Sequence, residues 1–196
     1  MSTPTGLRER KKIATREALR QAAIGLYRRH GPDKVTVEDI CAAAGVSPRT
    51  FFNYFATKDE AVFALEVDPA QIQRRITDRP RDEQPVEAVH AVYADLFAQL
   101  ATSEIWRQRT LLLRERPELA SRSTQARRAH EAAIAAAIAT RTGRPDDDLY
   151  VRTASMALHA AVRAAAGTWH PDHEPDIVAL LDRAMDILHD GLRLRD

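Results

Sequence analysis

Residues 36–58 read TVEDICAAAGVSPRTFFNYFATK, and this stretch predicts two short helices joined by a tight turn. Thr36 is expected to cap the first helix, because its hydroxyl can accept a hydrogen bond from an orphan backbone N–H and Asp39 completes a capping box three residues later. Gly45 is expected to end that helix, since glycine tolerates the positive φ of a sharp turn.

A second, shorter helix begins directly after this turn. Ser47 can cap it, and Pro48 suits its first position, where a missing backbone N–H costs nothing. We expect about two turns of helix, after which Thr57 caps the next helix with Glu60 at its third position. A helix, a short turn containing glycine and a second short helix form the helix-turn-helix pattern, whose second helix enters the DNA major groove. The stretch therefore predicts a protein that reads DNA.

Further landmarks surround this motif within residues 7–60. They are Ala22-Ala23, Leu26-Tyr27, Gly31, Val35-Thr36-Val37, Ile40, Ala44-Gly45-Val46-Ser47, Thr50-Phe51, Tyr54-Phe55 and Lys58. Together they resemble the N-terminal DNA-binding domain of the TetR family of transcriptional regulators. One departure is Phe52, where that family usually has a tyrosine. A phenol contact to DNA is therefore not available from this position, which leaves more of the contact to Asn53 or Tyr54.

Size and composition exclude several classes of protein. The chain has 196 residues, of which 44% are hydrophobic and 29% charged, a balance typical of folded globular proteins. No apolar run approaches the roughly eighteen residues of a membrane span, and no apolar leader is seen, so a cytoplasmic location is expected. The single cysteine, Cys41, cannot form an internal disulfide and is expected to be buried.

The net charge of +1 hides an asymmetry between the two parts of the chain. Residues 1–60 hold eleven Lys/Arg and seven Asp/Glu, whereas residues 61–196 hold eighteen Lys/Arg and twenty-one Asp/Glu. A basic N-terminal part followed by a mildly acidic remainder suits a polyanionic partner that binds the N-terminal part only. Ordinary solvated surface charge could give the same asymmetry, so the charge alone does not indicate DNA binding. The helix-turn-helix motif does.

Apolar residues recur at helical spacing through the rest of the chain, and alternating strand patterns are absent. The sequence predicts an all-α protein of about nine helices. One helix is expected from Thr57 to about Arg79, and Pro69 should bend or break it because proline removes a backbone hydrogen bond. An alanine-rich helix is expected over 118–142. The predicted organisation is a disordered tail at 1–6, a helix-turn-helix DNA-binding domain at 7–56 and a helical ligand-binding and dimerisation domain at 57–196.

The second helix of the motif carries side chains of the kinds that read bases. Arg49 can pair with guanine O6 and N7, and Asn53 can pair with adenine. Val46, Phe51 and Phe55 are expected to pack inward, which leaves these polar side chains on the opposite face.

Phosphate contacts are assigned to three groups of residues. Thr50, Tyr54 and Lys58 suit phosphate oxygens, as the resemblance implies. Thr36 and Ser47 can present a backbone N–H or hydroxyl from a helix N-terminus. A basic arm before the first helix can follow a neighbouring groove, although non-specific charge explains it equally well. The predicted DNA-binding set is Arg8, Lys11, Lys12, Thr36, Ser47, Pro48, Arg49, Thr50, Asn53, Tyr54 and Lys58.

A helix-turn-helix of this size reads only a few base pairs, so specific affinity needs two copies on a palindromic operator of double-stranded DNA. We expect a homodimer through the last two helices, at 147–168 and 176–193. Alanines between Ala154 and Ala166 would permit close helix approach, and the resemblance implies a four-helix dimer bundle here. The alternative is that these alanines pack only within one chain.

The remainder of the chain is longer than DNA binding requires, which indicates a sensing domain. An apolar stripe with a few polar groups could line a cavity for a small effector. The predicted lining is Tyr93, Phe97, Leu100, Trp106, Leu112, Met156, His159 and Arg163. The layout and the segment LLLRERPEL at 111–119 are similar to family members that bind acyl-coenzyme A-like or other lipophilic effectors. Such stripes also fill ordinary cores, so packing without a ligand stays open.

Metal, cofactor and enzyme sites have little support. His170 and His173 lie beside acids in a loop and could bind a divalent ion, but no further Cys/His set at ligand spacing accompanies them. Neither a phosphate-binding Gly-rich loop nor a nucleophile elbow is present. We therefore expect no metal, no cofactor and no enzymatic activity.

These features predict a homodimeric transcriptional repressor that a small, lipophilic ligand releases from its operator. An activator, or a regulator that needs its ligand in order to bind DNA, fits the same features. The remaining alternative is a helical small-molecule binder or enzyme whose front hairpin only mimics the motif.

Overall fold

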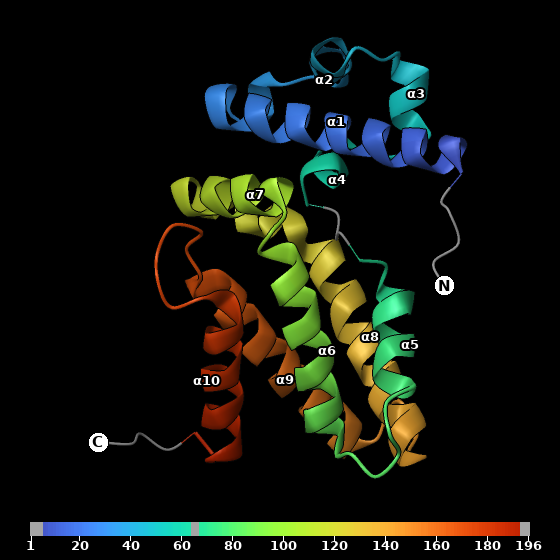
Figure 1. Ribbon diagram of the computed structural model, residues 1–196, viewed down its shortest axis with the longest axis vertical. Coiled ribbons are helices and arrows are strands. Elements are labelled where there is room, and N and C mark those ends of the chain that lie inside the picture. The colour runs from blue at the N-terminus through green and yellow to red at the C-terminus, as the bar shows by residue number, and fades with distance from the viewer. Residues whose placement is uncertain (1–5, 64–66, 193–196) are drawn as a thin grey trace. The chain divides into compact units, whose positions relative to one another are not determined.

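Helices account for every regular element that the computed structural model places in residues 6–63 and 67–192 (Figure 1). These ranges contain ten α-helices and two short 3-10 segments. The predicted all-α class is confirmed. The tenth helix arises because the helix expected over 57–79 is divided: α4 ends at Phe63 and α5 begins at Pro69, which occupies a first helical position and needs no N–H there.

Contacts divide the chain into two compact units, and each is described by itself. Among the described residues, the first unit contains 6–63 and 104–123, and the second contains 67–103 and 124–192. The sequence prediction separated the chain once, after residue 56. The structure instead groups residues 104–123 with the N-terminal helices. Except for Gly6, the predicted tail lies outside the described residues.

The first unit is built along α1 (Leu7–His30), a helix of 24 residues. In Figure 1, α2 and α3 lie on one side of α1, and α4 and α7 lie on the other. The further elements of this unit are η1 (Pro32–Lys34), α2 (Val37–Ala44), α3 (Pro48–Phe52), α4 (Lys58–Phe63), α7 (Glu104–Glu115) and η2 (Pro117–Ser123).

One apolar core joins the helix-turn-helix to α7 and η2. Ile24 and Tyr27 of α1 are fully buried together with Phe51 of α3. Leu112 of α7 and Leu119 of η2 belong to the same core. Because apolar burial is the main favourable term in folding, α7 and η2 are part of what stabilises the helix-turn-helix helices.

The turn of the motif has the predicted geometry. The Thr36 side chain accepts a hydrogen bond from the Asp39 N–H at 3.1 Å, and the Asp39 carboxylate accepts one from the Thr36 N–H at 2.9 Å, which completes the capping box. Gly45 follows with φ 66°, in the left-handed region that glycine tolerates. Ser47 then caps α3 by accepting from the Thr50 N–H.

Helix α3 is shorter than the two turns predicted, with five residues ending at Phe52. At its end the Asn53 N–H donates to the Thr50 carbonyl at 3.2 Å, and the Tyr54 N–H donates to the Phe51 carbonyl at 2.9 Å. These bonds span three residues and tighten the chain away from the α-helical path. The chain then reaches Phe55, which is buried in the core.

The second unit contains the remaining five α-helices among the described residues. They are α5 (Pro69–Thr77), α6 (Pro85–Leu100), α8 (Thr124–Thr142), α9 (Leu149–Thr168) and α10 (Ile177–His189). Helix α8 contacts α5 and α9, and α10 packs against α9 and α6 (Figure 1). The helix predicted over 118–142 begins later, at Thr124, because residues 117–123 form η2. Asp148 and Asp176 cap α9 and α10, because their side chains accept hydrogen bonds from backbone N–H groups of the first turn.

Replacing Thr36 with alanine should lower the free energy of unfolding by about 1 kcal/mol, because it removes the side-chain cap of α2. Urea denaturation followed by circular dichroism measures the change. Thr36→Ser keeps the hydroxyl and serves as the matched control, with stability close to that of the wild type. Equal stability of the alanine variant would show that the capping box contributes nothing.

Candidate nucleic-acid interface

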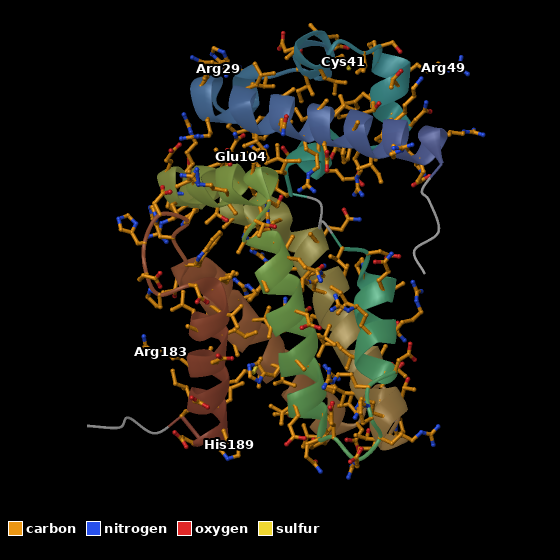
Figure 2. The ribbon with its side chains drawn as sticks, viewed as in Figure 1. Arg29, Cys41, Arg49, Glu104, Arg183 and His189 are labelled. Atoms are coloured by element: carbon orange, nitrogen blue, oxygen red, sulfur yellow. The ribbon has the colours of Figure 1, made fainter. Side chains whose placement is uncertain are left out.

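Helix α3 has a buried side and an exposed side. Phe51 and, just beyond the helix, Phe55 are almost completely buried, as predicted. Pro48, Arg49 and Asn53 are exposed. Figure 2 shows the Arg49 side chain extending outward from α3. The face of α3 that carries the predicted base-reading side chains is therefore open to a partner.

A hollow of about 740 Å³ brings the start of α1 next to the end of α3. Its lining contains three basic side chains and one acidic side chain from α1, together with polar side chains from α3 and the turn after it. The lining residues are Gly6, Arg8, Glu9, Lys11, Lys12, Thr15, Thr50, Asn53 and Tyr54. Arg8, Lys11 and Lys12 do not form an arm before the first helix, as predicted, because α1 already begins at Leu7. From within α1 they share one surface with the predicted recognition helix. Such a basic, polar hollow suits the phosphate backbone of DNA.

Two of the predicted phosphate contacts use their polar groups within the motif. Both the N–H and the hydroxyl of Thr36 donate to the Asp39 carboxylate, at 2.9 and 2.7 Å. These hydrogen bonds, the hydroxyl bond first, hold the pKa of Asp39 below its usual range. The Ser47 hydroxyl accepts from the Thr50 N–H and lies 3.0 Å from the Thr50 hydroxyl. In this structure both residues act as helix caps.

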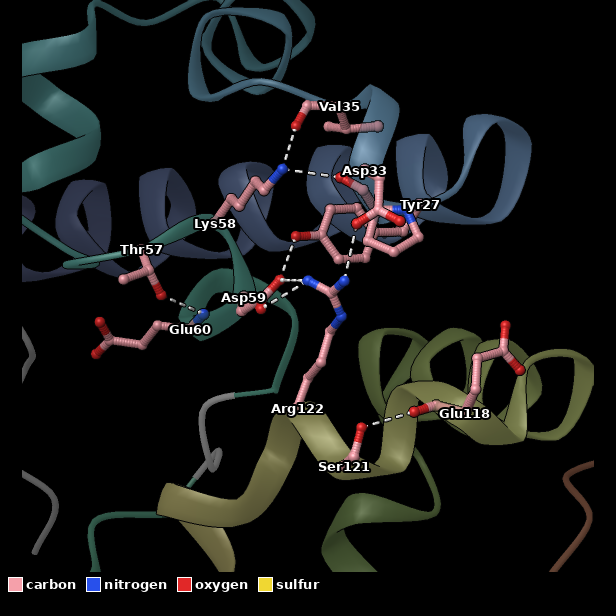
Figure 3. Close-up of polar contacts among 11 residues, drawn as sticks. Tyr27, Asp33, Val35, Thr57, Lys58, Asp59, Glu60, Glu118, Ser121 and Arg122 are labelled. Carbon is pink, nitrogen blue, oxygen red and sulfur yellow. Dashed lines mark hydrogen bonds and ion pairs between the residues drawn. The ribbon is translucent and has the colours of Figure 1, made fainter.

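Lys58 departs most clearly from the role that the resemblance implied. Its ammonium donates to the backbone carbonyls of Pro32 and Val35, at 2.8 and 2.7 Å, and the side chain is half-buried (Figure 3). These bonds tie the start of α4 to the segment that joins α1 and α2. Two of the three ammonium donors are therefore directed at the protein's own backbone and not at DNA phosphate.

An ion-pair network beside Lys58 connects four elements of the first unit (Figure 3). The Tyr27 hydroxyl donates to the Asp59 carboxylate at 2.6 Å. Arg122 of η2 donates to Asp59 at 3.2 Å and to Asp33 of η1 at 2.8 Å. Burial, followed by the hydrogen bond to Asp59, raises the pKa of Tyr27 far above its usual range. The network joins α1, η1, α4 and η2, so it fixes where η2 lies against the motif.

The predicted ligand-binding residues do not form a single group. Tyr93, Phe97, Leu100 and His159 are buried in the second unit. Trp106 and Leu112 lie in the first unit, and Leu112 is fully buried in its core. Met156, at 58% exposure, and Arg163 face solvent on α9. Leu112 is therefore a core residue of the helix-turn-helix unit because α7 packs there.

Within the second unit, aromatic and titratable side chains meet between α6, α8 and α9. The Tyr93 hydroxyl lies 3.4 Å from Nδ1 of His130, and the Tyr93 ring contacts Phe97 edge to face. His159 Nδ1 lies 3.6 Å from the Glu131 carboxylate. Burial lowers the pKa of His159, although Glu131 acts in the opposite direction. This arrangement is an apolar interior that carries a few polar groups.

The loop histidines and the cysteine complete the predicted sites. Nδ1 of His170 and Nδ1 of His173 lie 2.6 Å apart, and the described residues contain no group of three or more His, Cys, Asp or Glu placed to hold a metal ion. Cys41 is buried, as predicted, and burial raises the pKa of its thiol. Of the helices in the described ranges, none combines the length and the apolarity needed to cross a lipid bilayer.

Comparison with known proteins places this geometry in a family. The description "Bacterial regulatory proteins, tetR family" matches residues 19–65, and the description "MftR C-terminal domain" matches residues 83–193. The transcriptional regulator TcmR of Streptomyces glaucescens is 30% identical over 205 residues, covering 97% of this chain and 91% of TcmR. The chain belongs to the TetR family of transcriptional regulators.

Solved structures of TetR-type regulators share the fold. NalD, a repressor of a multidrug efflux pump in Pseudomonas aeruginosa, has a TM-score of 0.61 at 20% identity, over 93% of this chain and 97% of NalD. FadR of Bacillus subtilis, solved with stearoyl-CoA, has a TM-score of 0.58 at 21% identity, over 90% of this chain and 99% of FadR. The family confirms the predicted class, a DNA-binding regulator of transcription.

Two side chains of this TetR-family chain were not predicted as part of the site. Arg122 lies 63 positions from Asp59 in the sequence, so no local pattern connects them. Phe52 was treated only as the loss of a tyrosine hydroxyl, yet it is 58% exposed on α3. The sequence signal that could have identified it is its position, three residues after Arg49 and next to Phe51, which was predicted to pack inward.

Replacing Lys58 with methionine should lower the free energy of unfolding by about 2 kcal/mol, because two buried carbonyls lose a charged donor. The salt dependence of DNA binding by the folded fraction should stay unchanged. Urea denaturation and DNA titrations at two salt concentrations measure the two effects. Lys34→Met, which removes an exposed lysine of η1, is the control for charge alone. A salt slope reduced by about one would instead assign Lys58 to a phosphate.

Proposed function

We propose that this chain is a homodimeric repressor that lays α3 of each copy in the major groove of a palindromic operator. The observation that carries this proposal is the hollow where Arg8, Lys11 and Lys12 meet Thr50, Asn53 and Tyr54. A duplex needs both kinds of contact at one place, because phosphates fix the register and base edges supply the sequence. Because a repressor acts on DNA, the proposed location is the cytoplasm.

Side chains of the motif and of the start of α1 have distinct roles in this proposal. Arg49 on α3 and Asn53 directly after it read base edges, because both are exposed and both suit bidentate pairing with a purine. Lys11 and Lys12 neutralise phosphates beside the groove that α3 occupies. Thr36 and Ser47 serve as caps that hold the two helices of the motif in place.

The exposed face of α9 supports a dimer. Leu149 and Met156 are exposed by 79% and 58%, and their seven-residue spacing puts them on one helix face. Ala160 and Ala164 continue that face and are also exposed, whereas Ala161 and Ala165 pack within the chain. Large apolar side chains followed by small ones form a surface against which a second helix can approach closely. A second copy of α9 and α10 is the proposed partner.

The second unit is the proposed effector site. Its interior combines apolar side chains with the hydroxyl of Tyr93 and the imidazoles of His130 and His159. An interior of that composition suits a lipophilic molecule that has one polar end. The Bacillus subtilis FadR structure holds stearoyl-CoA. An acyl-coenzyme A-like effector is therefore the first candidate for this chain.

The segment 104–123 is the proposed link between effector and DNA. The chain leaves the second unit after α6, forms α7 and η2 within the first unit, and returns to the second unit as α8. Leu112 and Leu119 anchor this segment in the helix-turn-helix core, and Arg122 holds its end. An effector that shifts α6 would displace the start of this segment, and one that shifts α8 would displace its end. By linkage, DNA and effector then weaken each other's binding by the same factor.

Replacing Asn53 with alanine should cost about 1–3 kcal/mol of binding at one base pair and should relax the base preference at that position.

Replacing Lys12 with alanine should weaken binding to all sequences and lower the salt slope by about one for each copy. Fluorescence anisotropy on a duplex selected from a randomised pool by the wild-type protein measures both.

Lys34→Ala is the matched control, since Lys34 is an exposed lysine of the same unit that does not line the hollow. It should leave both affinity and salt slope close to those of the wild type. Failure of the wild type to enrich any sequence from the pool, or an equal loss for Lys12 and Lys34 variants, would contradict the proposed interface.

Native mass spectrometry of the protein as purified should give the mass of two chains together with a retained lipophilic molecule. Adding stearoyl-CoA should then weaken binding to the selected duplex, because the effector favours a form that does not fit the operator. A monomer mass at micromolar concentration would contradict the dimer. Tighter DNA binding in the presence of stearoyl-CoA would identify a regulator that needs its ligand, in place of a released repressor.

A further inference from the structure

Phe52 occupies an unusual position for an apolar side chain. Among the described residues of the first unit, two large apolar side chains are exposed, Ile13 by 47% and Phe52 by 58%. A single exposed apolar side chain is ordinary on a protein surface. Phe52, however, lies on α3, the helix proposed to enter the groove, whereas Ile13 lies on α1.

The ring of Phe52 shares a helix face with the proposed base-reading side chains. Arg49 and Phe52 stand at positions i and i+3 of α3, and residues at this spacing are neighbours on a helix surface. Asn53, at i+4, follows the helix directly and keeps helical backbone angles, with φ −74° and ψ −14°, so it continues the same face. All three are exposed, whereas Phe51 between them is fully buried. A duplex that contacts Arg49 and Asn53 would therefore also meet the Phe52 ring.

The exposed ring has a fixed support. The Phe52 ring centroid lies 5.4 Å from that of Phe51, with the planes at 85°, an edge-to-face contact. Phe51 in turn packs against Phe55, with ring centroids 5.7 Å apart, and both are buried in the core. Contacts of this kind orient an aromatic ring. The apolar surface that α3 presents at this point is therefore held in place before DNA binds.

The chemistry of the ring limits what it can recognise. Phenylalanine has no hydrogen-bonding group, so Phe52 cannot address the donors and acceptors of base edges or the oxygens of phosphates. The apolar group that unmodified base pairs present in the major groove is the C5 methyl of thymine. We infer that Phe52 reads a thymine methyl next to the base pairs contacted by Arg49 and Asn53, an inference that rests on the proposed groove-reading role of α3.

The test removes the methyl group from the DNA and the ring from the protein. Each thymine of a half-site, with its symmetric mate, is replaced by deoxyuridine in the duplex selected by the wild-type protein. At one position this change should weaken wild-type binding by about fourfold per half-site, the effect of losing one buried methyl group. Because both half-sites carry the change, the two effects together should weaken binding about fifteenfold. Phe52→Ala should bind the thymine and deoxyuridine duplexes equally.

Two controls separate this reading from a general loss of fit. Ile13→Ala removes the other large apolar side chain that is exposed among the described residues of the first unit, and it should keep the full deoxyuridine penalty. Phe52→Leu keeps an apolar group at the position and should keep part of that penalty. The thermal midpoint of Phe52→Ala should match that of the wild type within a few degrees, because the side chain is largely exposed.

Selection experiments give a second readout. Wild-type protein should enrich a fixed thymine at one position of each half-site, and Phe52→Ala should lose that preference while keeping the preferences read by Arg49 and Asn53. A wild-type half-site without such a thymine, or a deoxyuridine penalty that persists in Phe52→Ala, would overturn the inference while leaving the proposed function intact. Absence of any sequence selection by the wild type would overturn both.

Discussion

Burial of Phe51 and Phe55 is the constraint on which the rest of the first unit depends. Helix α3 has only five residues, too few to persist through its own hydrogen bonds. Each buried phenylalanine contributes about 1.5–3 kcal/mol, which is enough to hold such a short helix against α1 and α2. The same packing decides which side of α3 remains exposed. The orientation of the proposed DNA-reading face is therefore a consequence of the core beneath it.

That core also extends beyond the helix-turn-helix, which changes how the two units are related along the chain. Leu112 and Leu119 place α7 and η2 in the first unit, although their neighbours in sequence belong to the second. Arg122 adds a polar tie, since it pairs with Asp59 and Asp33 near the buried Tyr27 hydroxyl. The proposed link between effector and DNA rests on this burial, because a packed segment deforms little.

Polar side chains of the motif divide between holding the fold and facing solvent. Thr36 and Ser47 cap helices, and the Lys58 ammonium donates to two backbone carbonyls. Arg49 and Asn53 remain exposed to solvent. All five residue types occur at protein–DNA interfaces, so the sequence alone assigned all five to DNA. The caps made by Thr36 and Ser47 use partners three residues away, so the sequence also predicted them. The role of Lys58 depends on the Pro32 and Val35 carbonyls, 26 and 23 positions away, which no local pattern connects to it.

Local signals in the sequence determined the helices, the turn at Gly45, the inward set Phe51 and Phe55, and the class of protein. These features depend on caps, glycine conformation and apolar spacing, which act within a few residues of one another. Tertiary structure alone decided that Leu112 stabilises the helix-turn-helix unit, that Met156 faces outward and that Arg122 meets Asp59. Such pairings follow from how whole helices pack, because burial depends on neighbours that spacing along one segment cannot specify.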